Sequence, residues 1–125
     1  MIEEVKKSWG WEKWFANNES YCGKELFVRK NTWSSKGNYH YHKIKDETFY
    51  IIRGTLRLDF FGEGNNFATT VILDKGDSFR VVPGVRHRFT AMNTMGCHFI
   101  EASTTHSEED SYRCFWSEDE EWVEI

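Results

Sequence analysis

The chain has 125 residues and a formal net charge of −4, and 17% of its residues are aromatic. This length suits one folded domain over residues 1–125, and the aromatic content excludes a disordered chain. The acidic balance argues against a nucleic-acid-binding protein, which usually carries a basic surface. No apolar run is long enough to span a membrane and no signal-peptide pattern precedes Trp9, so we expect a cytoplasmic protein.

The first half of the chain predicts strands after a tryptophan-rich start. The opening twenty residues contain "WGWEKWF", which we expect to pack across the rest of the fold. The segment "KELFVRKNTW" (residues 24–33) alternates polar and apolar side chains and is predicted to be a strand. The segment "TFYIIRGTLRLDFF" (residues 48–61) predicts a hairpin that turns near Arg53 and Gly54.

Four further short strands are predicted between glycine-containing turns. Their sequences are "ATTVIL" (68–73), "SFRVV" (78–82), "RHRFTAM" (86–92) and "CHFIEA" (97–102). Many short strands at this spacing indicate an all-β sandwich or a small barrel. The acidic tail is expected to add one short helix or strand. Cys22, Cys97 and Cys114 form no C-x-x-C motif and are predicted to be buried free thiols.

Several candidate metal ligands lie in this pattern of strands. Residues two apart in a strand point to the same face, so Asn38, His40 and His42 share a face if the strand is regular. Glu47 begins the next predicted strand, and the parity of His87 directs it toward the same apolar interior. Three imidazoles and one carboxylate predict a site for one divalent ion, namely Mn, Fe, Co, Ni or Zn.

The spacing of these residues resembles two motifs of the cupin superfamily. H-x-H, four residues, E, six residues and G, as found from His40 to Gly54, resembles the first cupin motif. "GDSFRVVPGVRH", which ends at His87, resembles the second motif, although Val82 and Ala91 replace a proline and an asparagine that are common there. The resemblance implies a double-stranded β-helix, a jelly-roll barrel that is open at one end and holds the metal inside.

The flanking segments resemble small cupins grouped with mannose-6-phosphate isomerases. Those proteins carry a W-G lead-in, an H-x-H-x-x-K-x-E-x-F-Y core and an I-E-V-S-T tail followed by D-D-x-x-R. The matching positions here are Trp9, Gly10, Glu12, Lys45, Phe49, Glu101, Ser103, Thr104, Asp110 and Arg113. The resemblance implies a sugar or sugar phosphate as the small-molecule substrate, by analogy alone, because a fold does not fix a function.

Other side chains are candidates for catalysis and substrate binding. Glu101 shares parity with inward-pointing residues, and a buried carboxyl group can act as a base. We assign it as the catalytic candidate, with a structural carboxylate as the alternative. Asn38, Phe49, Phe89 and Arg113 are the substrate-binding candidates. The guanidinium of Arg113 could hold an anionic group or form an ordinary salt bridge.

Two remaining histidines are expected to lie outside the site. The parity of His98 opposes that of Glu101, so His98 is predicted to pack on the outer face of its sheet. His106 follows the last clear strand and is predicted to lie in a solvated loop, with a place near the barrel mouth as the alternative. Tyr50 and Ile52 make the outer face of their strand apolar, which predicts a homodimer or cover by the tryptophan-rich segment.

Three functions are compatible with these residues. The first is a metal-dependent isomerase or epimerase of a sugar or sugar phosphate, in which the metal stabilises an enediolate and Glu101 moves a proton. The second is an Fe(II) dioxygenase, because the same four ligands leave positions open for O₂. The third is a non-catalytic module that binds a sugar or another metabolite.

Overall fold

The structure of the protein is a computed structural model that describes residues 2–125. These residues form twelve β-strands and two short 3₁₀ helices, η1 and η2. Their bounds in chain order are β1 (Glu3–Lys7), β2 (Gly10–Asn17), β3 (Cys22–Val28), η1 (Ser34–Gly37), β4 (Tyr39–Tyr41), β5 (Glu47–Arg53), β6 (Leu56–Phe60), β7 (Thr69–Leu73), β8 (Ser78–Val81), β9 (His87–Ala91), β10 (Cys97–Ser103), η2 (Glu108–Asp110), β11 (Tyr112–Trp116) and β12 (Trp122–Glu124).

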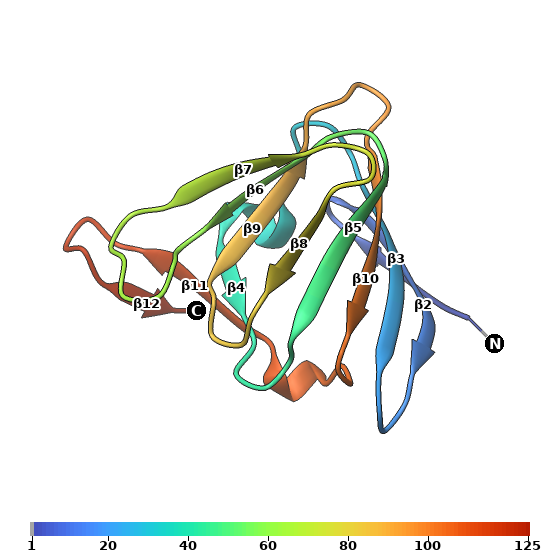
Figure 1. Ribbon diagram of the computed structural model, residues 1–125. Coiled ribbons are helices and arrows are strands. Elements are labelled where there is room, and N and C mark those ends of the chain that lie inside the picture. Colours follow the sequence, from blue (N-terminus) through green and yellow to red (C-terminus); the bar gives the residue numbers. More distant parts are fainter. Residues whose placement is uncertain (1) are drawn as a thin grey trace.

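The strands form two six-stranded antiparallel sheets that enclose an interior (Figure 1). The first sheet has the order β1-β2-β3-β10-β5-β8, and the second has the order β12-β11-β4-β9-β6-β7. From β4 to β11 the chain passes repeatedly from one sheet to the other, as in a jelly roll. The predicted all-β double-stranded β-helix is therefore confirmed.

The apolar core fills the end of the barrel near Gly54. Ile51 from the first sheet and Leu56 and Leu58 from the second have no exposed surface. Phe99 contacts Phe49 edge to face, with ring centroids 5.1 Å apart. Burial of each such side chain stabilises the fold by about 1.5–3 kcal/mol, so this cluster holds the two sheets together.

The turn at Arg53 and Gly54 is present, but the predicted hairpin around it is wrong. β5 pairs with β8 and β10 in the first sheet, whereas β6 pairs with β7 and β9 in the second. Gly54 has a φ of +87°, and a Cβ atom there would lie 2.5 Å from the carbonyl oxygen of Gly96. Only glycine fits where the chain crosses between the sheets, and alternation alone cannot distinguish a crossing from a hairpin.

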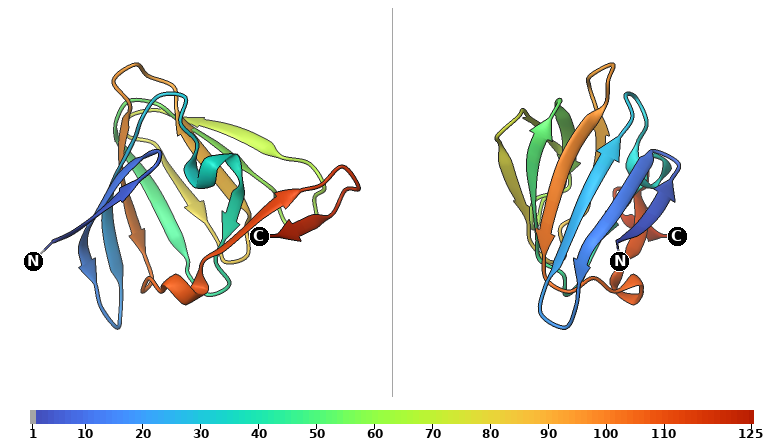
Figure 2. Two further views of the ribbon diagram at one scale, coloured as in Figure 1. Left: turned by 180° about the vertical axis from the view of Figure 1, so that it is seen from behind. Right: turned by 90° about the vertical axis from the view of Figure 1, so that its right-hand side faces the viewer.

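The tryptophan-rich segment extends the first sheet instead of packing across the barrel. The β1–β2 hairpin pairs with the edge of β3 (Figure 2). Trp9 closes the core against Phe89, with ring centroids 5.3 Å apart. Trp11 lies on the outer face of the sheet against Phe27 and His98, at 5.8 and 5.7 Å, as predicted for His98.

The outer face of β5 is not covered by this segment. Tyr50 is 47% exposed and Ile52 is 44% exposed.

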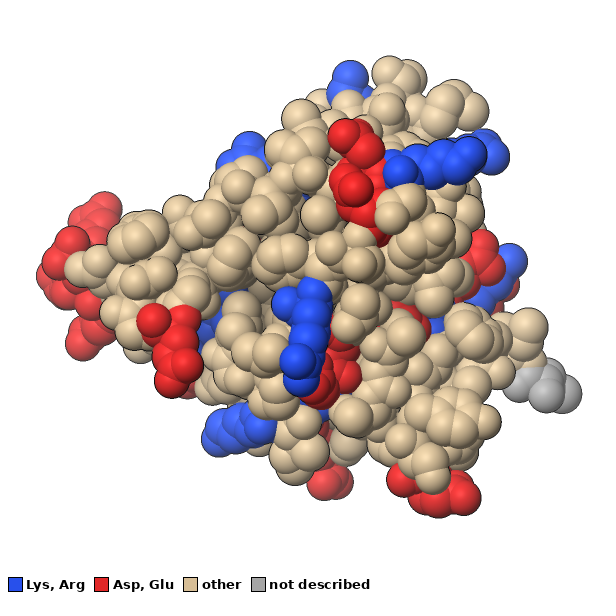
Figure 3. Space-filling model, viewed as in Figure 1, with Lys and Arg blue, Asp and Glu red and all other residues tan. Residues whose placement is uncertain are grey.

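The tail contains two strands and η2, where one short element was predicted. Its acidic residues 118–121 lie exposed at the tip of the β11–β12 hairpin (Figure 3). Cys22, Cys97 and Cys114 are buried and free, as predicted. Over residues 2–125, no helix has the length and apolar character needed to cross a membrane.

Candidate functional site

A cavity of about 170 Å³ lies between the two sheets at the end opposite the apolar core. Its walls include residues of β2 and β3 from the first sheet and of β4 and β11 from the second. The side chains of His40 and His42 line the cavity, as do those of Phe49, Phe89 and Glu101. The cavity therefore joins two of the four candidate metal ligands, His40 and His42, to the candidate base.

The fold brings the four predicted ligands together from separate strands. His40 lies in β4 directly opposite His87 of β9, and Glu47 is the first residue of β5. Nε2 of His42 is 3.3 Å from Oε2 of Glu47, and Nε2 of His87 is 3.8 Å from the same oxygen. The rings of His40 and His87 have centroids 4.0 Å apart. One carboxylate oxygen thus faces two imidazole nitrogens.

Backbone carbonyl groups fix the orientation of two of these rings. Nδ1 of His42 is 2.8 Å from the carbonyl oxygen of Asp110, and Nδ1 of His87 is 3.0 Å from that of Val85. A carbonyl oxygen only accepts, so each Nδ1 carries the proton and donates it. Both rings therefore present Nε2 to Glu47, in the arrangement that holds imidazole ligands in metalloproteins.

Burial and mutual charges set the protonation states of the cluster. Burial lowers the pKa of His40 and of His87. Burial alone would raise the pKa of the Glu47 carboxyl group, but the close contact with His42 and the charges of His87 and Lys45 hold this pKa well below its usual range. In return, Glu47 outweighs burial and raises the pKa of His42. An ionised carboxylate beside neutral rings of His40 and His87 matches the protonation states that bind metal ions.

The unsatisfied atoms of this cluster fit a bound cation. Nδ1 of His40, Oε2 of Glu47 and Nε2 of His87 are buried and have no hydrogen-bond partner among the described residues. Each buried polar atom without a partner lowers the stability of the fold by about 1–3 kcal/mol, and a bound cation would remove this penalty. In residues 2–125 no three His, Cys, Asp or Glu side chains already surround one point as ligands. Metal binding would therefore require these side chains to turn toward a shared centre.

Comparison with protein families identifies the fold. The family model described as "Cupin domain" matches residues 29–103, more than half of the chain, and this segment contains all four candidate ligands. The chain belongs to the cupin family.

Solved structures of other cupin-like proteins share this architecture. Oxalate decarboxylase from Bacillus subtilis superposes with a TM-score of 0.77 at 17% identity, over 90% of this chain and 30% of that chain. CapF from Staphylococcus aureus superposes with a TM-score of 0.77 at 13% identity, over 90% of this chain and 31% of that chain. KdgF from Halomonas sp. superposes with a TM-score of 0.69 at 15% identity, over 86% of this chain and 89% of that chain. At these identities the likeness concerns the fold alone.

The present cupin spans less than a third of the oxalate decarboxylase and CapF chains. Mn(II) centres are described for the oxalate decarboxylase. A search of curated protein sequences finds no match. The narrower resemblance to mannose-6-phosphate isomerases stays a prediction.

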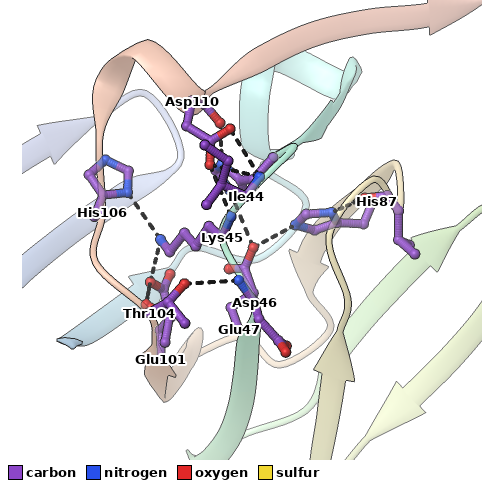
Figure 4. Close-up of polar contacts among 12 residues, drawn as sticks. Ile44, Lys45, Asp46, Glu47, His87, Glu101, Thr104, His106 and Asp110 are labelled. Carbon is purple, nitrogen blue, oxygen red and sulfur yellow. Dashed lines mark hydrogen bonds and ion pairs between the residues drawn. The ribbon is translucent and has the colours of Figure 1, made fainter. Parts of the chain in front are cut away.

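A second charged cluster lies beside the ligands in this cupin (Figure 4). Nζ of Lys45 is 2.5 Å from Oε2 of Glu101 and 3.0 Å from Nδ1 of His106. An ammonium group only donates, so Nδ1 of His106 accepts and its Nε2 donates to Glu108 at 3.0 Å. Burial, assisted by the charge of Glu47, raises the pKa of the Glu101 carboxyl group. The inward position predicted for Glu101 is confirmed.

The remaining predicted residues divide between the cavity and its surroundings. Phe49, Phe89 and Arg113 line the cavity, and Nε of Arg113 lies 3.4 Å from Oγ of Ser35. Asn38 lies between η1 and β4 and is not among the residues that line the cavity. The structure therefore does not bring Asn38 together with the other candidates, because the regular strand begins one residue after it.

Sequence reasoning missed several cavity residues, among them His106, Lys24 and Glu12. The prediction of a solvated loop around His106 is wrong, because its side chain is only 7% exposed and lines the cavity. No strand periodicity reaches this residue, so no pattern could have indicated its direction. Lys24 and Glu12, by contrast, share parity with apolar neighbours in β3 and β2, and their burial could have been inferred.

Asp110 holds the loop that carries Lys45. Its carboxylate accepts the backbone N–H groups of Lys43 at 2.9 Å, of Ile44 at 3.2 Å and of Lys45 at 3.0 Å (Figure 4). Its backbone carbonyl accepts from His42. The last residue of η2 thus positions both a candidate ligand and the ion-paired lysine.

Replacing Asp110 with alanine removes the acceptor of three buried N–H groups. We expect Asp110→Ala to lower the free energy of unfolding by about 1–3 kcal/mol, and Asp110→Asn, which keeps one acceptor oxygen, to lower it less. Urea denaturation measures this change. Asp119→Ala at the exposed tip of the β11–β12 hairpin is the control, and equal stability of the Asp110 and Asp119 variants would contradict the prediction.

Proposed function

We propose that this cupin is a metal-dependent isomerase or epimerase of a sugar or sugar phosphate. His40, His42, Glu47 and His87 would hold one divalent ion, which is Mn, Fe, Co, Ni or Zn. The unsatisfied buried atoms of three of these side chains support the metal, as do the Mn(II) centres described for oxalate decarboxylase. When bound, the metal supplies Lewis-acid polarisation of a carbonyl oxygen.

The position of Glu101 is the observation that carries the proposed reaction class. This carboxylate is 4% exposed and lines the same cavity as His40 and His42. Its raised pKa moves it toward the range where a general base works at neutral pH. A base beside a metal that polarises a carbonyl suits proton transfer between C2 and C1 of an open-chain sugar.

Each neighbouring side chain has a separate part in this proposal. Glu101 takes the proton from C2 and returns it at C1, while Ser103 donates a hydrogen bond to its Oε2 at 2.9 Å and orients it. Lys45 stabilises the ionised form of Glu101 through their contact. Phe49 and Phe89 limit the access of water to the reacting carbons. Arg113 is available to a distal phosphate.

A non-catalytic sugar-binding module is the second candidate. The observation that favours it is the same ion pair, because a carboxylate already held by Lys45 and Ser103 can be purely structural. The two functions differ in one measurable result. Only an isomerase or epimerase exchanges the C2 proton of a sugar with solvent.

The metal proposal predicts the effect of removing single ligands. His40→Ala and His87→Ala should each lower the affinity for Mn²⁺ at least about tenfold, because each removes one donor of the set. Metal content measured by inductively coupled plasma mass spectrometry, with circular dichroism to verify folding, tests this. His98→Ala on the outer face is the control. Wild-type metal content in either ligand variant would refute the assignment.

The catalytic proposal predicts the effect of neutralising the base. Glu101→Gln should keep metal bound but slow exchange of the C2 proton about 10²–10⁴-fold, because an amide does not accept that proton. Deuterium uptake from D₂O into a panel of aldoses and their phosphates measures it by NMR. Glu25→Gln, on the next strand and facing outward, is the control.

Two results would count against this role of Glu101. Full exchange of the C2 proton in Glu101→Gln would show that Glu101 is not the base. Glu101→Asp keeps the charge beside Lys45, so it distinguishes loss of the base from loss of folding. No exchange in fully metal-loaded wild-type protein would favour the binding module, and O₂ consumption with Fe(II) would favour a dioxygenase.

We also propose that the protein is a homodimer. The exposed Tyr50 and Ile52 on the outer face of β5 support this, because apolar side chains on a sheet face are commonly covered by a partner. Light scattering at micromolar concentration should give twice the chain mass of 14.9 kDa. A mass of one chain would exclude the dimer under those conditions.

A further inference from the structure

Lys24 is a buried cation that the proposed reaction does not use. It lies in β3 directly opposite Glu101 of β10, and its side chain is 3% exposed and lines the cavity. Its Nζ lies 4.4 Å from the ring centre of Trp14. A lysine with its charged group inside a protein is rare unless that group is paired.

The pairing of this ammonium group is incomplete. Nζ of Lys24 has three N–H donors, and among the described residues its one hydrogen-bond acceptor is Oε1 of Glu12, at 3.5 Å. That oxygen already accepts a 2.7 Å hydrogen bond from Nε1 of Trp14. Buried charges are normally compensated by close, well-formed partners. Lys24 therefore has N–H donors without acceptors, and they lie in a cavity large enough to hold a small charged group.

We propose that Lys24 binds an anionic group of the ligand, with carboxylate or phosphate oxygens as its acceptors. Lys24 is then a specificity-determining residue that selects an acidic sugar or a sugar phosphate over a neutral sugar. The inference depends on the proposed function only in taking the ligand to be a sugar. The anion preference itself comes from the unfilled donors of Lys24.

The charges that line the cavity support an anion. Four basic side chains, Lys7, Lys24, Lys45 and Arg113, line it together with three glutamates. Glu101 is held by Lys45 and Ser103, and Glu108 is held by His106. Glu12 accepts from Trp14 and from Lys24. All three carboxylates thus have partners, whereas Lys24 and Arg113 keep free donors toward the cavity.

A charged acceptor suits Lys24 better than a sugar hydroxyl group does. Hydrogen bonds in which both partners are charged are about twice as strong as neutral ones. An ammonium group out of water also needs negative charge nearby, which a hydroxyl group does not supply. Lys45 differs from Lys24 in this respect, because its ammonium group already contacts Glu101 and His106.

Binding of three sugars that differ in charge tests the proposal. The probes are D-glucose, D-glucuronate and D-glucose 6-phosphate, titrated by calorimetry or saturation-transfer NMR into metal-free and Mn²⁺-loaded protein. We expect at least one anionic probe to bind about tenfold or more tightly than glucose in both forms, the equivalent of one charged hydrogen bond. Preference for glucuronate identifies a carboxylate, and preference for the phosphate ester identifies a phosphate.

Substitutions assign the preference to Lys24. Lys24→Met should abolish it while leaving metal content unchanged, and Lys24→Arg, which keeps the charge, should retain it. Lys13→Met is the control, because Lys13 lies on β2 with its side chain over Trp11, away from the cavity. The arginine variant keeps the test valid if the methionine variant does not fold.

Two results overturn the proposal. One is wild-type protein that binds neither anionic probe more tightly than glucose. The other is an undiminished preference in folded Lys24→Met. Failure of the proposed isomerase is recognised separately, because it appears as absent C2 exchange while the anion preference of the metal-free protein persists.

Discussion

The carboxylate of Asp110 bonds to three successive backbone N–H groups of residues 43–45, and the geometry of the cavity depends on this contact. The loop it holds lies between His42 and Glu47, so these two candidate ligands are held relative to the segment after β10. The carbonyl of the same residue orients His42. Hydrogen bonds to a charged acceptor are among the stronger ones in proteins. Several of them from one carboxylate therefore keep this loop in a single conformation.

The barrel divides its interior between two kinds of packing. Near Gly54 the two sheets meet through aliphatic and aromatic side chains, of which Leu56, Leu58 and Phe99 are completely buried. At the other end the same strands place Glu47 and Glu101 inside. Buried charges cost stability unless they are paired, and here each carboxylate has a cationic or imidazole neighbour. The apolar end thus provides the stability on which a polar site can be built.

Strand parity was enough to predict which side chains at the centre of the candidate site point inward. Because side chains alternate along a strand, His40 and Glu101 could be placed inside from their neighbours alone, and the structure agrees. The pairing of β5 and β6 could not be predicted, since a two-sheet barrel and a hairpin produce the same alternation. His106 was misplaced for a different reason: its position depends on hydrogen bonds to Lys45 and Glu108, and such contacts leave no periodic signal.

The cavity is lined both by the segment that carries the candidate ligands and by the two segments that flank it. Residues 29–103, which match the cupin family, contain the four candidate ligands and Glu101. Lys7, Glu12 and Lys24 precede that segment, while His106 and Arg113 follow it, and all five line the cavity. Exchanging the two flanking segments between cupins while keeping Asp110, which orients His42 and holds residues 43–45, could therefore alter which molecules enter, so the choice of substrate could be engineered with the candidate ligands left in place.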